Sequence, residues 1–372
     1  MRVKDICILQ NGRAFKPDDW GSEGLPIVRI QNLNDESAPF NYYAGEYNPV
    51  HEINDGELLF SWSGTPGTSF GAFRWFRGKG VLNQHIFRVI PKIDVDKEYL
   101  KYALNGNIQT IIAKAHGGVG LQHITKKELD EVEIRILPLK QQQEIVAILC
   151  RVEELIKCRK KELQKLDDLI KSRFVELFGD PSINTKGYPV KRLSEIAEYW
   201  NGLTYKPEDV ADKGTIVLRS SNIQNAQLDF EDTVRVICNI GEKKYVQDND
   251  ILMCSRNGSA RLVGKVALIK NIEEPMSFGA FMMIIRSQYY PYLLTYFQMP
   301  AFRAQITTGA TTTINQITGR MLDNIKLPVP EKNELNSFIL FIEQVEKSKA
   351  AVQAALDKAQ LLFDSLMQEY FG

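Results

Sequence analysis

Two polar stretches, at corresponding places in the two halves of the chain, carry side chains suited to binding another molecule. In and just after the first stretch, SWSGTPGTS at 61–69, the candidates are Ser61, Trp62, Ser63, Thr65, Arg74, Arg77 and Lys79. In the second stretch, CSRNGSARLVGK at 254–265, they are Arg256, Asn257, Ser259, Arg261 and Lys265. Such groups hydrogen-bond to base edges, and the basic ones also bind phosphates. We therefore interpret both stretches as candidate nucleic-acid contacts, with ordinary solvated loops as the alternative.

A third polar stretch, TTGATTTINQ at 307–316, adds the candidates Thr311, Thr312 and Gln316. Its counterpart is HGGVGLQH at 116–123. We predict that the glycine-rich part, HGGVG at 116–120, is a flexible loop and not a phosphate cradle, because it follows a helical pattern. Some polar residues and glycines are instead identical in the two halves: Asn11, Gly12, Arg29 and Asn32, with Asn201, Gly202, Arg219 and Asn222. Identical side chains do not distinguish two ligands, so we interpret these residues as ones that hold turns or that contact phosphate and a partner subunit.

The stretches correspond because the chain consists of two copies of an internal repeat. NGRAFKPDD at 11–19 is repeated as NGLTYKPED at 201–209, and ITKKELDEVEI at 124–134 is repeated as ITGRMLDNIKL at 317–327. SRFVELFG, which ends at Gly179, is matched by SLMQEYFG, which ends at Gly372. Two copies are too few for a solenoid and favour a molecule with pseudo-two-fold symmetry.

The first part of each copy mixes short strands and helices. Strands are predicted for ELLFSWS, GAFRWF, QHIFRVI and FMMIIRS, and helices for DKEYLKYALN and YLLTYFQM. Thr125 and Glu128 form a capping-box pattern for a short helix ahead of a closing strand.

The second part of each copy predicts one long helix. Residues 141–178 contain neither Gly nor Pro, and a seam alternates in steps of four and three: Ile145, Leu149, Val152, Ile156, Arg159, Leu163, Leu166, Ile170, Arg173 and Leu177. The same spacing recurs from Phe338 to Tyr370, which is typical of a coiled coil. About 38 helical residues extend roughly 57 Å. We expect the two helices to pair antiparallel; the alternative is a helix lying across its own domain.

These patterns predict an α+β fold with two similar mixed α/β recognition domains separated by two long helices in an antiparallel coiled coil. The domain bounds are 1–138 and 180–330 for the recognition domains, and 139–179 and 331–372 for the helices. Two related heads at a fixed separation suit a ligand with two regularly spaced sites, such as duplex DNA.

Composition narrows the class of protein. The chain has 46 basic and 46 acidic residues, so its net charge is zero, which argues against a simple electrostatic DNA binder. No apolar run approaches the length of a membrane helix. Five cysteines without a CxxC pair indicate reduced thiols in a cytoplasmic protein.

The junction ILPLKQQQEIV at 136–146, followed by the heptad helix and ELFGD, resembles the specificity subunits of type I restriction-modification systems. The second junction, LPVPEKNELNSFI, keeps Pro328 and Pro330 but has Asn333 and Glu334 where that family commonly has Gln. The resemblance covers all 372 residues. It implies that each head reads one half of a bipartite double-stranded DNA site. The helices would set the spacer and dock two methyltransferase subunits.

The resemblance also implies that this chain is not an enzyme. S-adenosylmethionine would be bound by the methyltransferase partners, and ATP and Mg by restriction subunits if these are present. In agreement, the sequence has no Asn/Asp-Pro-Pro-aromatic motif, no GxGxxG and no P-loop, and its His and Cys spacing is not that of a zinc finger. We therefore assign no catalytic and no metal-binding residue.

Two other hypotheses remain open. One is a stand-alone DNA methyltransferase or nuclease whose motifs are unrecognised. The other is a coiled-coil adaptor that bridges two protein partners without nucleic acid.

Overall fold

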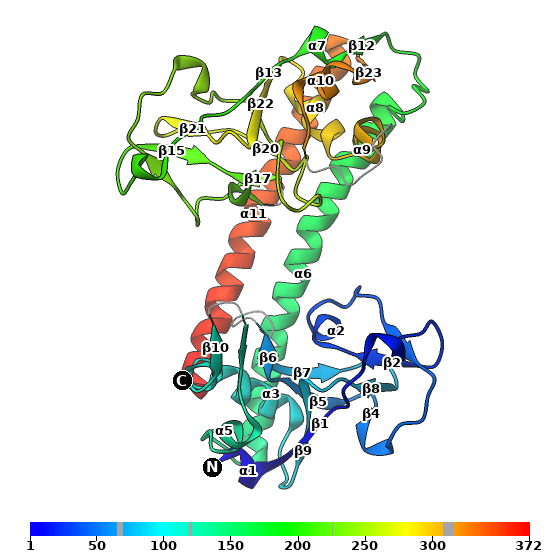
Figure 1. Cartoon of the computed structure of the whole chain (residues 1–372), viewed down its shortest axis with the longest axis vertical. Coiled ribbons are helices and arrows are strands. Elements are labelled where there is room, and N and C mark those ends of the chain that lie inside the picture. The colour runs from blue at the N-terminus through cyan, green and yellow to red at the C-terminus, as the bar shows by residue number, and fades with distance from the viewer. Residues whose placement is uncertain (65–69, 119–120, 225, 308–315) are drawn as a thin grey trace. The chain divides into compact units, whose positions relative to one another are not determined.

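The computed structural model of the chain describes residues 1–64, 70–118, 121–224, 226–307 and 316–372. It forms two compact units (Figure 1). Unit 1 contains Met1–Lys160 and Gln353–Gly372, and unit 2 contains Lys161–Val352. Each unit therefore holds one head and a part of both long helices.

The head of unit 1, called here the first head, is built on two four-stranded sheets. The first has the order β1 (Cys7–Asn11), β9 (Ile86–Pro91), β5 (Glu57–Ser61), β7 (Gly71–Trp75), all antiparallel. The second has the order β3 (Asn41–Tyr43), β2 (Leu25–Val28), β8 (Gly80–Leu82), β4 (Glu52–Ile53). Both faces of β5 are covered, because successive side chains point to opposite sides of a strand. Leu58 and Phe60 join the core beneath α3 (Lys97–Gly106), whereas Leu59 packs with Val28 of the second sheet.

Shorter elements complete the first head. They are α1 (Val3–Ile6), α2 (Ile30–Asn34), α4 (Ile108–Ala113), α5 (Lys126–Asp130) and a three-stranded sheet of β6 (Ser63–Gly64), β10 (His116–Gly118) and β11 (Leu121–His123). The predicted capping box is confirmed, since Thr125 and Glu128 cap α5 reciprocally. The prediction of a flexible loop at 116–120 is wrong for residues 116–118, because these form β10 and pair with β11. The expected closing strand after α5 is reduced to an isolated bridge between Arg2 and Glu133.

The head of unit 2, called here the second head, repeats this topology. Its main sheet has the order β13 (Glu198–Asn201), β22 (Met282–Arg286), β19 (Ile251–Cys254), β20 (Val266–Leu268). A second sheet has the order β14 (Val210–Ala211), β18 (Arg235–Val236), β15 (Thr215–Leu218), β21 (Met276–Phe278). The parallel pair β15–β21 corresponds to β2–β8 of the first head.

The remaining elements of the second head are short. The strands are β12 (Val190–Arg192) paired with β23 (Lys326–Pro328), and β16 (Ile223–Gln224) paired with β17 (Gln227–Leu228). The helices are α7 (Leu193–Ile196), α8 (Tyr290–Phe297), α9 (Pro300–Thr307) and α10 (Gly319–Asp323). The predicted strands and helices of both heads are thus present, apart from the closing strand of the first head.

The identical residues of the repeat have structural roles. A Cβ atom on Gly12 would lie 2.2 Å from the carbonyl oxygen of Asn83, and one on Gly202 would lie 2.1 Å from that of Phe278. Only glycine allows such a close approach of two backbones. Asn32 and Asn222, both buried, accept hydrogen bonds from the backbone N–H groups of Arg29 and Arg219. The asparagines therefore hold turns, as the sequence predicts.

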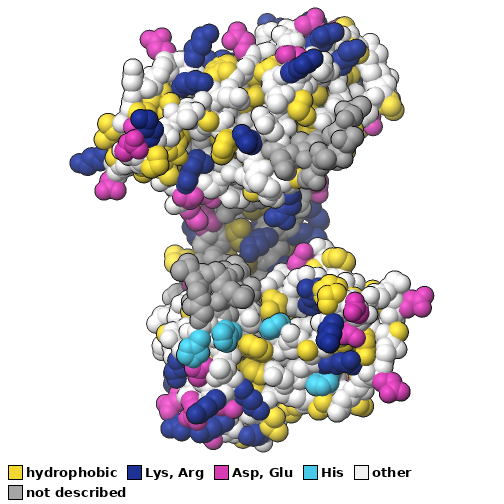
Figure 2. Space-filling view, in the orientation of Figure 1, with side chains coloured by type: hydrophobic (Ala, Val, Ile, Leu, Met, Phe, Trp, Pro, Cys, Tyr) yellow, Lys and Arg dark blue, Asp and Glu magenta, His cyan; other side chains and the backbone are white. Residues whose placement is uncertain are grey.

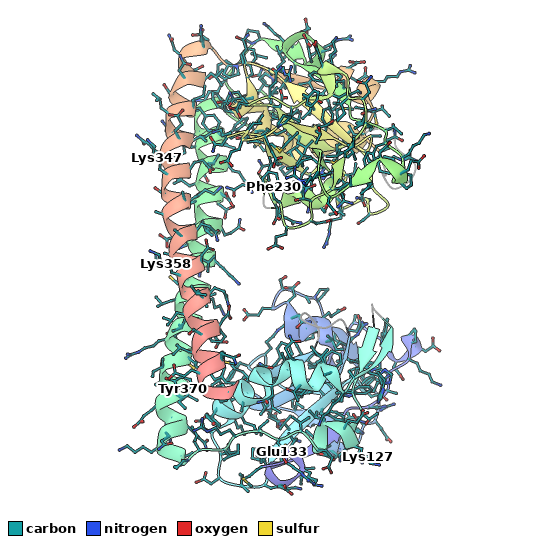
Figure 3. All side chains as sticks on the ribbon, turned by 90° about the vertical axis from the view of Figure 1, so that its left-hand side faces the viewer. Lys127, Glu133, Phe230, Lys347, Lys358 and Tyr370 are labelled. Atoms are coloured by element: carbon teal, nitrogen blue, oxygen red, sulfur yellow. The ribbon has the colours of Figure 1, made fainter. Side chains whose placement is uncertain are left out.

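The two long helices are α6 (Leu139–Phe178) and α11 (Lys332–Phe371), with 40 residues each. None of the ten predicted seam residues of α6 is classed as exposed, and the same holds for the matching positions of α11. Away from the seam, Lys347 and Lys358 project from α11 into solvent (Figure 3). The seam is thus shielded from water to a large extent, while charged residues away from it, such as these two lysines, stay exposed.

Contacts within each unit define how the helices pair. In unit 2, Asp167 contacts Lys349, Arg173 lies over Phe341, and Phe174 packs on Phe338 with ring centres 5.8 Å apart. Residue numbers rise along α6 as they fall along α11, so the helices are antiparallel there. In unit 1 the start of α6 and the end of α11 share one core cluster, which includes Leu149 and Phe371. The predicted α+β fold with paired antiparallel helices is confirmed.

Candidate nucleic-acid interface

All five candidates of the second stretch lie on one loop, residues 255–265, which joins β19 to β20; we call it the second-head loop. The start of this loop is tied to the sheet. The backbone N–H groups of Ser255 and Arg256 both donate to the carbonyl oxygen of Phe281, at 2.9 and 3.0 Å. Farther along, Asn257 donates to the hydroxyl of Ser220 at 3.2 Å. The loop therefore presents its side chains from an anchored backbone.

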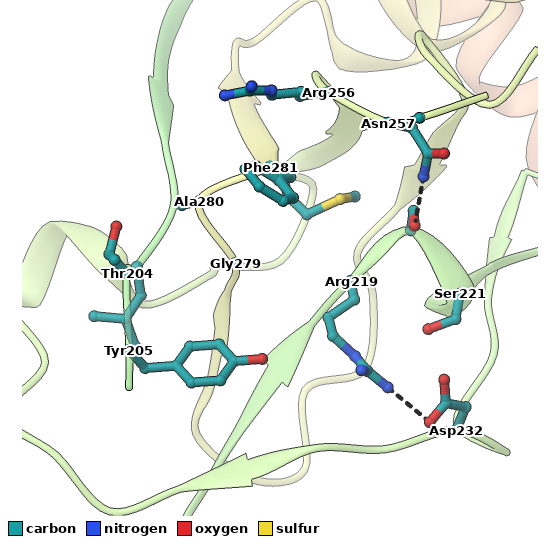
Figure 4. A pocket seen from close by; sticks show the side chains of 14 residues that line it. Thr204, Tyr205, Arg219, Ser221, Asp232, Arg256, Asn257, Gly279, Ala280 and Phe281 are labelled. Carbon is teal, nitrogen blue, oxygen red and sulfur yellow. Dashed lines mark hydrogen bonds and ion pairs between the residues drawn. The ribbon is translucent and has the colours of Figure 1, made fainter. Parts of the chain in front are cut away.

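A cavity of about 1070 Å³ opens beside the second-head loop (Figure 4). Its walls come from four segments that are distant in sequence: 203–205, 219–221, 256–258 and 279–282, together with Asp232. Two aromatic side chains, Tyr205 and Phe281, line it. Aromatic surface combined with converging polar groups is a common composition of ligand-binding sites.

The two arginines of the cavity differ in their partners. Arg219 forms an ion pair with Asp232 at 2.6 Å. The guanidinium of Arg256 lies over the Phe281 ring, 5.3 Å from its centre. Within the described part of the chain, no carboxylate pairs with Arg256, and its side chain is exposed. Arg256 thus retains free hydrogen-bond donors at the edge of the cavity.

The other candidates of the second head have mixed surroundings. Ser259 and Arg261 are exposed, and the ammonium of Lys265 donates to the carbonyl oxygen of Ile223 at 3.4 Å. Gln316 is exposed and forms a backbone bridge with Arg256. Thr311 and Thr312 lie outside the described residues. The structure therefore brings Gln316 next to the second-head loop, although 60 positions separate Gln316 from Arg256 in sequence.

The candidates at the end of β5 in the first head are largely enclosed. Ser61 is fully buried, and Ser63 is 9% exposed. Trp62 stacks on Phe87, with ring centres 5.7 Å apart, and its indole N–H donates to the carbonyl oxygen of Gln84 at 3.1 Å. Thr65 lies outside the described residues. Ser61, Trp62 and Ser63 thus shape the local fold.

The three basic candidates of the first head are held by internal contacts. Arg74 pairs with Glu98 at 3.2 Å and is 17% exposed. Arg77 donates to the backbone carbonyl oxygens of Asn32 and Ala38, and its guanidinium lies over the ring of Phe40. Lys79 pairs with Glu52 at 2.9 Å.

The β5–β7 hairpin also separates these basic residues from the serines. In its antiparallel register Ser61 faces Gly71, whereas Leu58 faces Arg74 at the other end. The structure therefore does not bring Arg74, Arg77 and Lys79 together with Ser61–Ser63. In the sequence these basic residues follow the loop closely and suggest one basic group around it. The direction of β7 instead carries them away from the loop.

Sequence reasoning missed the aromatic part of the cavity, Tyr205 and Phe281. Tyr205 belongs to the repeated NG–KP motif, so its recurrence as Phe15 in the first head was an available signal. Phe281 was assigned to a predicted strand, and nothing in the sequence indicated that 59% of it would be exposed.

The described residues offer little for covalent or metal chemistry. Burial raises the pKa of Cys7 to about 12 and also raises the pKa of Cys254, so both thiols are protonated at neutral pH. No group of three His, Cys, Asp or Glu residues in the described ranges is arranged to hold a metal ion. None of the described helices is long and apolar enough to cross a membrane.

Charges on the surface are mixed. On the face shown in Figure 2, basic and acidic side chains alternate over both units without a large area of one sign. This pattern agrees with the zero net charge of the chain. Long-range attraction to a polyanion is therefore weak, and contacts depend on individual residues such as Arg256.

Comparisons with known proteins agree with the repeat. Residues 1–168 and 185–358 each match the family described as type I restriction modification DNA specificity domain. The type I restriction enzyme MjaVIII specificity subunit of Methanocaldococcus jannaschii is 25% identical over 394 aligned positions, which cover 96% of this chain and 90% of that protein. The EcoBI specificity subunit of Escherichia coli is 20% identical, covering 98% of this chain and 83% of that protein.

Solved structures show the same fold. The S subunit of a type I restriction-modification system from M. genitalium aligns over all of this chain and 95% of its own, with a TM-score of 0.53 and 14% identity. A chain from a study of the assembly of a type I R-M system aligns with a TM-score of 0.54 and 16% identity, over all of this chain and 96% of its own. Because the family match includes both copies of the repeat, this chain belongs to the type I restriction-modification DNA specificity family.

Proposed function

We propose that this chain is the DNA sequence-specificity subunit of a type I restriction-modification complex, in which each head reads one half of a bipartite site. The observation that carries the proposal is the family match to both copies, each of which consists of a head followed by a long helix. Two heads with the same topology and different loops are suited to docking alike on DNA while reading different bases. In this proposal, residues 1–138 and 180–330 read the bases of the two half-sites. Residues 139–179 and 331–372 set the length of the spacer between them.

The two heads contribute unequally in this proposal. In the second head, Arg256, Asn257, Ser259, Arg261 and Lys265 share one anchored loop beside the cavity, so they are the favoured base and phosphate contacts. In the first head, Arg74, Arg77 and Lys79 are engaged internally. We therefore do not propose these three side chains as base contacts.

Catalysis belongs to partner subunits in this proposal. Two methyltransferase subunits would bind S-adenosylmethionine and dock on the helices, and restriction subunits, where present, would use ATP and Mg. A chain without surplus positive charge gains little from phosphate neutralisation. We therefore infer that the partners supply much of the positive surface that binds DNA.

The decisive experiment is a map of methylated adenines in host cells with and without the gene for this chain. A split sequence motif should be methylated only when the gene is present. Persistence of every methylated motif after deletion would refute the proposal. In a separate assay, the purified chain with DNA and labelled S-adenosylmethionine should transfer no methyl group until a methyltransferase subunit is added.

The role of the helices is tested by length. Removing one heptad from each helix shortens the pair by about 10 Å, which corresponds to roughly three base pairs at about 3.4 Å each. The methylated motif should keep both half-sites and lose about three base pairs of spacer. An altered half-site with an unchanged spacer would contradict the proposed role of the helices.

A further inference from the structure

The second head has an exposed arginine that an aromatic ring holds in place. Arg256 lies over Phe281, 5.3 Å from the ring centre, at the edge of the cavity (Figure 4). A cation over an aromatic face is attracted by the ring electrons, and the planar guanidinium also stacks well on it. The ring therefore restricts a side chain that would otherwise sample many rotamers.

The backbone beneath this pair is also fixed. The carbonyl oxygen of Phe281 accepts hydrogen bonds from the N–H groups of Ser255 and Arg256 and from the hydroxyl of Ser255. Arg256 also forms a backbone bridge with Gln316. Ring and guanidinium are thus presented by two segments that cannot separate without breaking several hydrogen bonds.

The charge of Arg256 has no internal counterpart among the described residues, whereas Arg219 in the same cavity is neutralised by Asp232. A guanidinium carries five N–H donors in a planar fork. These donors remain available for a ligand, and the fork suits an acceptor pair in one plane.

We propose that Arg256 reads a guanine in one half-site by donating two hydrogen bonds to its O6 and N7 atoms, with Phe281 as the positioning residue. This inference rests on the proposed function of the chain. Guanine is the base that offers two adjacent acceptors in the major groove, and arginine is its commonest partner. A phosphate can also accept two hydrogen bonds from the fork, but only a base contact makes methylation depend on the identity of one base pair.

The first head lacks this pair. The hydrogen bond from the N–H of Trp62 to the carbonyl oxygen of His85 corresponds to the one from Ser255 to Phe281. Ser63 and His85 therefore take the places of Arg256 and Phe281, and Ser63 is 9% exposed. The contact is specific to the second head, so it concerns one half-site.

The test is methylation by the complete complex in cells and with purified oligonucleotides. The mapped motif must contain a G·C pair in one half-site. Arg256→Ala should relax the base preference at this pair and leave the other half-site unchanged. The wild-type complex should discriminate against other bases at this pair by roughly 5- to 150-fold, and the variant by much less. Guanine replaced by 7-deazaguanine, which lacks the N7 acceptor, should slow the wild-type complex and leave Arg256→Ala unaffected.

Three further variants make the result specific. Phe281→Leu should weaken discrimination at the same position, and Phe281→Tyr should restore it because the ring is kept. Arg235→Ala, which breaks an exposed ion pair with Glu274 elsewhere in the head, should leave the motif unchanged. If Arg256→Ala abolishes methylation entirely, the wild-type response to 7-deazaguanine at each guanine of the two half-sites still decides the matter.

Some outcomes would overturn the inference. Uniformly weaker methylation by Arg256→Ala with the same motif would indicate a phosphate contact. The inference would also be refuted if neither half-site contained a G·C pair. The same holds if Arg256→Ala methylated the wild-type motif with unchanged base preference. Failure of the wild-type chain to direct methylation of any split motif would instead refute the proposed function.

Discussion

Equivalent hairpins in the two heads use their basic residues differently. In the first head, Arg74 of β7 is held by Glu98, and Arg77 and Lys79 are bonded within the fold. In the second head, Arg256 lies on the loop itself and is free of acidic partners among the described residues. The same arrangement of strands thus holds its arginines in internal contacts in the first head. In the second head it leaves Arg256 available for a ligand.

The difference shows how a duplicated module can keep its fold while its ligand contacts change. Residues common to both copies, such as Gly12 and Gly202, lie where two backbones meet. Residues that differ, such as Ser63 and Arg256, lie at the strand end, where loop length and side-chain type can vary without disturbing the sheets.

Alanine at the shared glycines should have the largest effect and should be alike in both heads. In Gly12→Ala or Gly202→Ala the new Cβ would overlap a backbone carbonyl, which costs about 3 kcal/mol or more. Calorimetry should show one unit melting roughly 6–12 °C lower. If either variant kept full stability, the close backbone contact at that glycine would not be required in its head, and the two heads would differ in this respect.

Alanine at Arg74 and at Arg256 should separate structure from ligand contact. Arg74→Ala leaves Glu98 without this partner in a mostly buried site, so we expect a loss of about 1–2 kcal/mol in unfolding free energy with an unchanged DNA motif. Arg256→Ala should change stability by less than about 0.5 kcal/mol. Urea unfolding measures the unfolding free energy of both variants. An equal loss in the two would contradict the different roles of Arg74 and Arg256.

Among the seam positions at which the two helices differ, one has Ile156 in α6 and Lys349 in α11. Lys349 is 12% exposed and pairs with Asp167 at 2.8 Å, while Asp167 itself is 36% exposed. Lys349→Met should leave stability unchanged or raise it by up to about 1 kcal/mol, because Asp167 can return to water. Asp167→Ala should lower it by about 1 kcal/mol, since a mostly buried ammonium loses one of its two acidic partners and keeps only Glu346.

The pH dependence of this pair has a defined sign. Desolvation lowers the pKa of Lys349, but its bonds to Asp167 and Glu346 outweigh this and raise it. A raised folded-state pKa means that the stabilisation is complete below the ordinary lysine pKa and is lost as pH rises through the folded value. The difference in unfolding free energy between wild type and Lys349→Met should therefore change as the pH rises through the alkaline range.

The smallest expected effect concerns the equivalent short helices α5 and α10. Hydrogen bonds from Thr125 lower the pKa of Glu128 to about 2, whereas α10 has Met321 at that position. A lowered carboxyl pKa stabilises above the unfolded value and loses its effect as pH falls towards 2. The stability difference between wild type and Glu128→Gln should shrink below about pH 4.5. A constant difference would argue against the capping carboxylate as its cause.

Local patterns in the sequence were sufficient for much of this fold. The seam of α6 and the capping box at Thr125 depend on neighbours three or four residues apart, so the chain itself specifies them. The double repeat likewise needs no coordinates. For the candidate site, the sequence grouped the five residues of the second-head loop because they lie close together in the chain, within 255–265. Their contact with DNA stays a prediction.

Only the tertiary structure decided which candidate side chains are free. Whether Arg74 meets Glu98, or Arg256 meets Phe281, depends on strand direction and on segments more than 20 residues apart, which no local pattern encodes. The exposure of Phe281 and the cavity around it arise in the same way, from four separate segments that converge. The sequence by itself determined the repeat, its elements and the residue types available, and the packing of distant segments determined which of them can reach a ligand.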